Sequence, residues 1–223
     1  MKSVSSFFCS TLGRKQLMAV AGLSLCLFVL SHALGNLLLL VSPQAYNTYA
    51  HGIITNPLLY LAEAGLVLMF VLHIIEGVLV TLTNRKARPQ NYAVYASGEK
   101  RTTYTQRTMM WQGGVILAFV VLHLITFKYG EVYTVRYGDV EMRDLFRLVY
   151  EVFQSPGYVV WYIFAVAVLG FHLSHGFYSS LQTLGANHPA YTPKIKCASV
   201  LYGILIGGGC AVQPIYMMFF HQA

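Results

Sequence analysis

Charged side chains are scarce in this chain: Asp, Glu, Lys and Arg make up 10% of its 223 residues, whereas a soluble domain carries about 25%. Only eight are acidic, which leaves little material for a carboxylate-based active site in water. Hydrophobic residues make up 56% of the chain, and the mean hydropathy is +0.56. This composition argues against a soluble globular protein and against a disordered one, and it favours a polytopic membrane protein.

Cysteine is also sparse, and no two of the four cysteines have C-x-x-C spacing. The spacing argues against covalent c-type haem attachment and against a four-thiolate zinc or iron–sulfur site. The net charge is +7, but the basic residues lie between apolar runs rather than in a basic patch. We therefore expect no nucleic-acid partner.

Five apolar stretches reach or approach the roughly 20 residues that a helix needs to cross a bilayer. They cover about residues 17–41, 57–82, 109–127, 157–181 and 197–220. The sequence thus predicts an all-α fold in one domain, 1–223, with five transmembrane helices in a lipid bilayer. The first stretch is longer than the roughly 7–15 apolar residues of a signal peptide, so we expect it to be retained.

The basic residues are distributed unevenly between the two sides of the membrane. Eleven Lys and Arg lie in the N-terminal tail and in the segments after the second and fourth stretches, and four lie on the other side. Basic segments stay in the cytoplasm, so we expect a cytoplasmic N-terminus and a C-terminus outside. The outer segment 140–153 has apolar residues at helical spacing among charges, which predicts a short amphipathic helix on the outer surface.

Histidine recurs in four of the five stretches. The octets FVLSHALG (28–35), FVLHIIEG (70–77), FVVLHLIT (119–126) and GFHLSHGF (170–177) each place a histidine deep in an apolar helix. These are His32, His73, His123 and His172. A single buried histidine can be a hydrogen-bonded polar residue between helices, but four in four helices indicate function, because ionisable groups are costly in lipid. Neutral imidazole is a good haem-iron ligand.

Depth along each helix pairs the four histidines. At a rise of about 1.5 Å per residue, His32 and His123 lie level towards the outer face. His73 and His172 lie level towards the inner face, roughly 15 Å away along the membrane normal. This predicts two stacked bis-histidine b haems in a bundle of four helices. Gly35, Gly77 and Gly176 follow ligands on the same helix faces, where they would leave room for a macrocycle or serve ordinary helix packing.

The spacing differs from that of the respiratory cytochrome b of quinol:cytochrome c oxidoreductases, which carries two ligands in one helix. The chain instead resembles the single-chain, five-helix, di-haem cytochrome b subunit of succinate:quinone and quinol:fumarate oxidoreductases. The resemblance rests on Arg14–Lys15, AGLSLCLFVLSHALGN, HIIEG and FHLSHGFYSSLQTLG, together with the four histidines, and it covers nearly the whole chain.

The resemblance implies partners and a place in the cell. The partners are a flavoprotein subunit, which interconverts succinate and fumarate, and an iron–sulfur subunit on the cytoplasmic face of a bacterial inner membrane. The quinone is commonly menaquinone. The resemblance puts the proximal haem on His73 and His172 and the distal haem on His32 and His123. It favours His172 over His175, one turn later, and leaves His175, Arg14, Lys15 and Trp111 as candidate propionate or quinone contacts.

Two carboxylates lie within the apolar stretches. Glu63, near the outer end of its helix, is either a buried, protonated residue hydrogen-bonded across helices or the proton acceptor for quinol oxidised there. Glu76 is expected to be a solvated or salt-bridged residue at the inner helix end. Some members of the family carry a glutamate two residues before the fourth ligand, where this chain has Gly170.

The first hypothesis is therefore an electron-transfer subunit of a succinate dehydrogenase or fumarate reductase complex. Its dicarboxylate chemistry would lie on a partner subunit. The alternatives are a structural anchor without haem and another b-type membrane cytochrome, such as an ascorbate- or hydrogenase-linked reductase.

Overall fold

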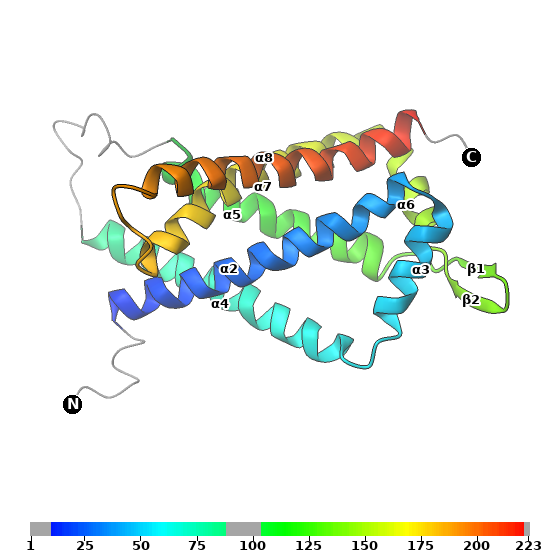
Figure 1. Ribbon diagram of the computed structural model, residues 1–223, viewed down its shortest axis with the longest axis horizontal. Coiled ribbons are helices and arrows are strands. Elements are labelled where there is room, and N and C mark those ends of the chain that lie inside the picture. Colours follow the sequence, from blue (N-terminus) through cyan, green and yellow to red (C-terminus); the bar gives the residue numbers. More distant parts are fainter. Residues whose placement is uncertain (1–9, 88–103, 221–223) are drawn as a thin grey trace.

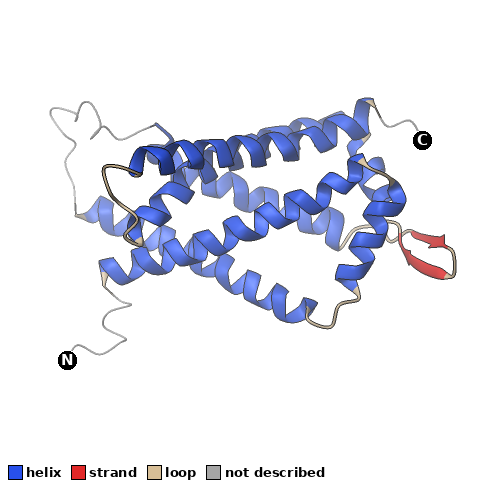
Figure 2. Ribbon diagram, viewed as in Figure 1, coloured by secondary structure: helices blue, strands red, loops and turns tan. Residues whose placement is uncertain are grey.

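The computed structural model describes residues 10–87 and 104–220. Within these ranges, five helical segments are long and apolar enough to cross a membrane. They are α2 (Thr11–Asn36) with the 3-10 turn η1 (Leu37–Leu40), α4 (Leu59–Lys86), α5 (Tyr104–His123) with the π-helical turn η3 (Leu124–Lys128), α7 (Pro156–Thr183) and α8 (Thr192–Phe219). They run along the long axis of the molecule (Figures 1 and 2), which confirms the expected all-α fold class.

The helices extend beyond the apolar stretches because local signals set their ends. Ser10 caps α2, where its hydroxyl accepts a hydrogen bond from Gly13 N at 3.1 Å. Both α7 and α8 have a proline in their first turn, where the missing N–H costs nothing. The polar turns before the first and fifth stretches are therefore helical as well.

Helices α2, α7 and α8 form the tightly packed part of the bundle. The buried residues of α2 are nearly all small, including Gly13, Ala19, Ala21 and Ala33. One buried cluster joins Cys26 and Ala33 of α2 to Leu173 of α7 and Ile206 of α8. Small side chains let helix backbones approach closely, which is the main source of helix association in lipid.

Helices α4 and α5 are packed differently. Val80 is the one buried residue of α4, and α5 has none among its residues in the structure. Helix α4 lies along α2, α5 lies along α7, and α4 and α5 meet only loosely. The order around the bundle is therefore α2, α4, α5, α7, and α8 packs on the outside of α7 and α2.

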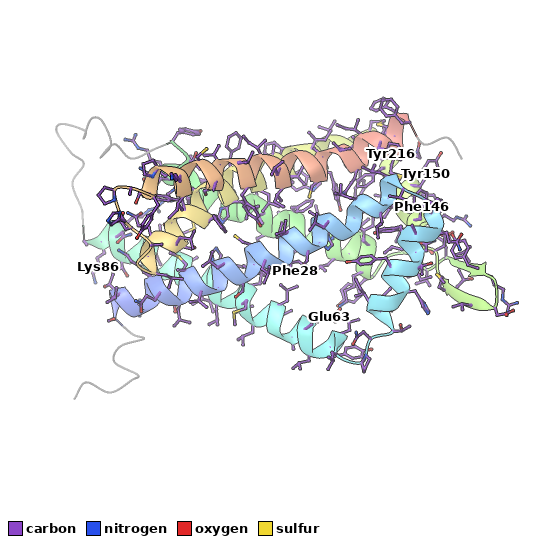
Figure 3. All side chains as sticks on the ribbon, in the orientation of Figure 1. Phe28, Glu63, Lys86, Phe146, Tyr150 and Tyr216 are labelled. Atoms are coloured by element: carbon purple, nitrogen blue, oxygen red, sulfur yellow. The ribbon has the colours of Figure 1, made fainter. Side chains whose placement is uncertain are left out.

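Three further elements close one end of the bundle. They are α3 (Pro43–Ile54), a hairpin of β1 (Thr134–Tyr137) and β2 (Val140–Arg143), and α6 (Leu145–Phe153). Figure 3 marks Phe146 and Tyr150 of α6 at the same end as Tyr216 of α8. A buried cluster at this end combines residues of η1, α3, α6, α7 and α8, and Phe119 of α5 and Phe127 of η3 pack against it. We call these elements the cap.

The prediction of an amphipathic helix over residues 140–153 is wrong for residues 140–143. Residues 140–143 form β2, because Gly138 takes a left-handed turn conformation with φ of 62° and lets the chain fold back on β1. The helix begins only at Leu145, after the N-cap Asp144, whose carboxylate accepts from Arg147 N at 3.1 Å. Its apolar face, with Phe146, Leu148, Val149 and Phe153, is buried, and three of these residues share a cluster with η1, α3, α7 and α8.

Asn47 of α3 joins α3 to the start of α6 by two hydrogen bonds. Its side chain is fully buried, donates to Asp144 Oδ1 at 2.8 Å and accepts from Phe146 N at 2.9 Å. One amide thus satisfies both the capping carboxylate and a backbone N–H of α6, although 97 residues separate Asn47 from Asp144.

We expect Asn47→Ala to destabilise the cap. The substitution removes the two hydrogen bonds of this buried amide, with Phe146 N and with Asp144 Oδ1, each worth about 0.5–1.5 kcal/mol. The purified variant should unfold at a lower temperature and be cut faster by protease in the segment 129–144. Asn187→Ala, at an exposed hydrogen bond with Thr192, should change neither property, and equal behaviour of the two variants would contradict this role.

Candidate cofactor site

The structure brings the four span histidines together in the two pairs that depth along the helices predicts. The ring centroids of His32 and His123 lie 5.8 Å apart, and the ring planes cross at 77°. Those of His73 and His172 lie 6.2 Å apart and cross at 75°. It is His172, and not His175, whose ring meets His73.

Each pair crosses a diagonal of the bundle. His32 is on α2 and His123 on α5, whereas His73 is on α4 and His172 on α7. Neither α2 with α5 nor α4 with α7 is among the helix pairs that pack closely in the described ranges. The imidazoles therefore reach each other across the bundle interior. All four residues remain partly accessible, so the protein does not pack tightly around them.

The spacing of the rings fits two ligands of one metal ion. Two imidazoles bound from opposite sides, each through a nitrogen–metal bond of about 2 Å, have centroids about 6 Å apart. Nowhere in the described chain do three or more His, Cys, Asp or Glu residues converge on one point. Two histidines leave the remaining positions of a six-coordinate ion to another group, and a porphyrin supplies four nitrogens.

Hydrogen bonds orient two of the four rings. His73 Nδ1 lies 3.3 Å from Met18 O. A carbonyl only accepts, so the proton is on Nδ1 and Nε2 is left bare for a metal. His123 Nδ1 lies 3.3 Å from the hydroxyl of Tyr162, which belongs to the buried cluster at the cap end. Both contacts leave Nε2 of the ring as the free nitrogen.

Two buried polar atoms near the His73/His172 pair have no hydrogen-bond partner among the described residues. They are His172 Nδ1 and Glu76 Oε2, one turn beyond His73. Orphaned buried groups are uncommon in native proteins and call for an explanation. The sequence predicts Glu76 at a helix end, solvated or salt-bridged, but α4 continues ten residues beyond it to Lys86. It is partly accessible, its Oε2 is shielded, and it forms no ion pair in the described ranges. Together with the loose packing of α4 and α5, these atoms fit a site that a prosthetic group completes.

The glycines near the histidines have different surroundings. A Cβ added to Gly176 would meet nothing within 4 Å, and one added to Gly77 would meet only Met18 Sδ, at 4.0 Å. Both positions leave open space, as a macrocycle requires. Gly35 does not, because the side chain of Tyr49 fills the space beside it. Gly22, which the sequence did not single out, lies against His73: its Cβ would be 3.2 Å from His73 Cε1.

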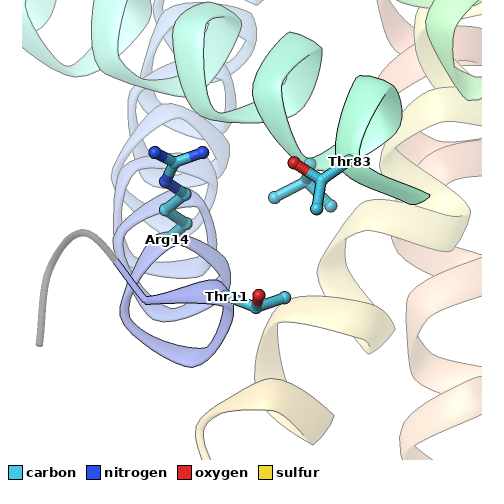
Figure 4. Close-up of a pocket in the computed structure, with 4 residues that line it drawn as sticks. Thr11, Arg14 and Thr83 are labelled. Carbon is cyan, nitrogen blue, oxygen red and sulfur yellow. The ribbon is translucent and has the colours of Figure 1, made fainter. Parts of the chain in front are cut away.

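The candidate contacts at the basic end are only partly brought together. Arg14 lines a small pocket between α2 and α4 with Thr11, Val80 and Thr83 (Figure 4), and it has no acidic partner in the described chain. Lys15 and His175 are half-buried. Trp111 is 76% exposed and has no ring or hydrogen-bond partner in the described ranges, as is typical of a membrane-interface anchor.

Glu63 is only partly buried, and its one hydrogen-bond partner among the described residues is charged, so the first of the two alternatives, a buried, protonated glutamate, is wrong. Its carboxylate is paired with the ammonium of Lys128 at the end of η3. Figure 3 marks Glu63 on the part of α4 that diverges from α2. Lys128 lies five residues beyond His123 towards the cap, so Glu63 is on the cap side of the His32/His123 pair.

Comparison with protein-family models, with curated proteins and with solved structures finds no match for this chain.

Gly170 lies where α7 touches α8, so the glutamate found there in some members of the resembled family would not fit. A Cβ at Gly170 would lie 2.8 Å from Gly203 O, a backbone atom that cannot swing away. We expect Gly170→Ala to separate α7 from α8 and to destabilise the protein by about 1–3 kcal/mol, as overpacking does. Gly208→Ala, in open space on α8, is the matched control. Equal thermal unfolding of the two variants and the parent protein would contradict the close contact.

Proposed function

We propose that this chain is the membrane-anchor and electron-transfer subunit of a succinate:quinone or quinol:fumarate oxidoreductase complex. It would hold two b haems, one between His73 and His172 and one between His32 and His123. The observation that carries the proposal is a crossed imidazole pair with a centroid separation near 6 Å, found on both diagonals of one helical bundle. Bound haem would supply one-electron transfer between quinone and the soluble subunits.

The chain's own residues would prepare both sites. Met18 O keeps the His73 proton on Nδ1, and the Tyr162 hydroxyl holds the His123 ring from the cap side. Such outer contacts orient ligands and raise their basicity. Gly77 and Gly176 leave space beside the His73/His172 pair. The loosely packed faces of α4 and α5 would then be completed by the two macrocycles.

The two ends of the bundle would meet different partners. Basic residues gather where α2 and α8 begin and α4 ends: Arg14, Lys15, Arg85, Lys86, Lys194 and Lys196. By the positive-inside rule this would be the cytoplasmic side. The resemblance would make the membrane a bacterial inner membrane, with the iron–sulfur and flavoprotein subunits docked on this side. Menaquinol would be oxidised, or menaquinone reduced, at the cap end, with Glu63 as the proton acceptor or donor.

We expect the purified chain to contain two b haems, measured as pyridine haemochrome per polypeptide. His73→Ala should leave one, because it removes a ligand from one diagonal and none from the other. His175→Ala, one turn from the proposed ligand His172, should leave two. One haem in the parent chain would mean that a pair is misassigned, and none in a folded preparation supplied with haem would leave a structural anchor.

Identifying the subunits that co-purify with the chain distinguishes the proposed function from that of another b-type cytochrome. If the proposal is right, a flavin-containing and an iron–sulfur subunit co-purify with the chain from native membranes, and the complex oxidises succinate or reduces fumarate. Two haems with neither subunit would favour a different reductase.

The proposed membrane orientation predicts at which positions a fused phosphatase is active. A phosphatase fused after Ala223 should be active, because we expect that end outside, where the enzyme can form its disulfides. The same enzyme inserted at Pro189, between α7 and α8, should be inactive. The reverse pattern would overturn the topology and move the docking face to the cap end.

A further inference from the structure

The end of α5 departs from an α-helix directly after His123. Tyr129 N donates to Leu124 O at 3.0 Å, the i→i+5 bond of the π-helical turn η3. Such turns are rare and occur frequently at functional sites. The last residue of this turn is Lys128.

A residue of the cap holds this turn in place. The guanidinium of Arg143, on β2, donates to Phe127 O at 3.1 Å, to Glu131 O at 3.1 Å and to Lys128 O at 3.4 Å. The last carbonyls of a helix have no partner within it, so Arg143 satisfies them from outside. The backbone of Lys128 is therefore fixed by the cap and not by α4.

From this fixed point, Lys128 reaches Glu63 on α4. Its ammonium bonds Oε1, while Oε2 accepts no hydrogen bond from any described residue. The two side chains are 40% and 34% exposed, and an ion pair this accessible adds little stability. It is also the one ion pair that joins two different elements in the described ranges, α4 and η3. We therefore expect the ion pair to matter for the position of the Glu63 carboxylate more than for stability.

We propose that Lys128 is a positioning residue for Glu63 in quinol oxidation: it holds one carboxylate oxygen so that the other faces the quinol. The inference rests on the proposed function. Oxidation of one quinol breaks two O–H bonds and releases two protons and two electrons. Glu63 Oε2 receives a proton from the quinol oxygen and passes it to outer water before taking the next. The electrons leave to the iron–sulfur subunit.

The test uses the whole complex and measures menaquinol oxidation with fumarate as the acceptor. Lys128→Met should lower kcat about 10²-fold, the loss expected for a reacting group misplaced by about 1 Å. The value of kcat/KM should fall equally, because the quinol itself does not touch the lysine. Lys128→Arg should restore most of the rate. The haem content should stay at the level of the parent complex.

Two further variants show whether Lys128 acts through Glu63. Glu63→Gln should abolish quinol oxidation, and Lys128→Met combined with Glu63→Gln should be no slower than Glu63→Gln alone, because a positioning residue has nothing left to position. The matched control is Arg147→Met. It breaks an exposed ion pair within α6, with Glu151 at 2.8 Å, and should leave kcat unchanged.

An unchanged kcat in Lys128→Met would overturn the inference. So would a loss of haem or of thermal stability that accounts for the slower rate, since the lysine would then only hold the helices. Fumarate reduction with a soluble dye as electron donor should be the same in all variants. If the parent complex holds no haem or does not oxidise quinol, the proposed function is wrong, and so is this inference, which rests on it.

Discussion

The close approach of α7 and α8 is the contact on which the other helices depend. Gly170 and Gly203 bring the two backbones together, and Cys26 and Ala33 of α2 pack against the same pair of helices. In lipid, apolar side chains gain little by leaving the solvent, so close backbone packing has to hold the helices together. Helices α4 and α5 are each attached to this scaffold along one side, α4 on α2 and α5 on α7.

This uneven packing explains the position of the histidines. A bundle packed tightly on all sides would have filled its interior with side chains. Here α4 and α5 contribute almost no buried residue, and the interior between them and the scaffold is crossed by two imidazole pairs. Each pair joins a scaffold helix to a loosely attached one. A group bound between the rings would therefore tie α4 and α5 to the rest of the bundle.

The two ends of the bundle are built for different tasks. The cap end is closed by α3, the hairpin and α6, which share one buried cluster with the ends of the spans. On the outside of the cap, hydrogen bonds from Arg147 and Tyr133 keep the pKa of Glu151 below its ordinary value, so this exposed carboxylate stays charged beside the arginine. The opposite end carries the basic helix termini and has no such closure in the described ranges.

The five spans, the level of each histidine and the uneven distribution of basic residues could be read from the sequence. They depend on hydropathy and on the constant rise of a helix, which are local properties. The tertiary structure decided which of His172 and His175 meets His73, that Tyr49 occupies the space beside Gly35, and that Glu63 is paired with Lys128. It also placed β2 where helical spacing predicted a helix, and buried Asn47 beneath α6. These features depend on residues far apart in the chain, because partners such as Asn47 and Asp144 are brought together only when the helices pack.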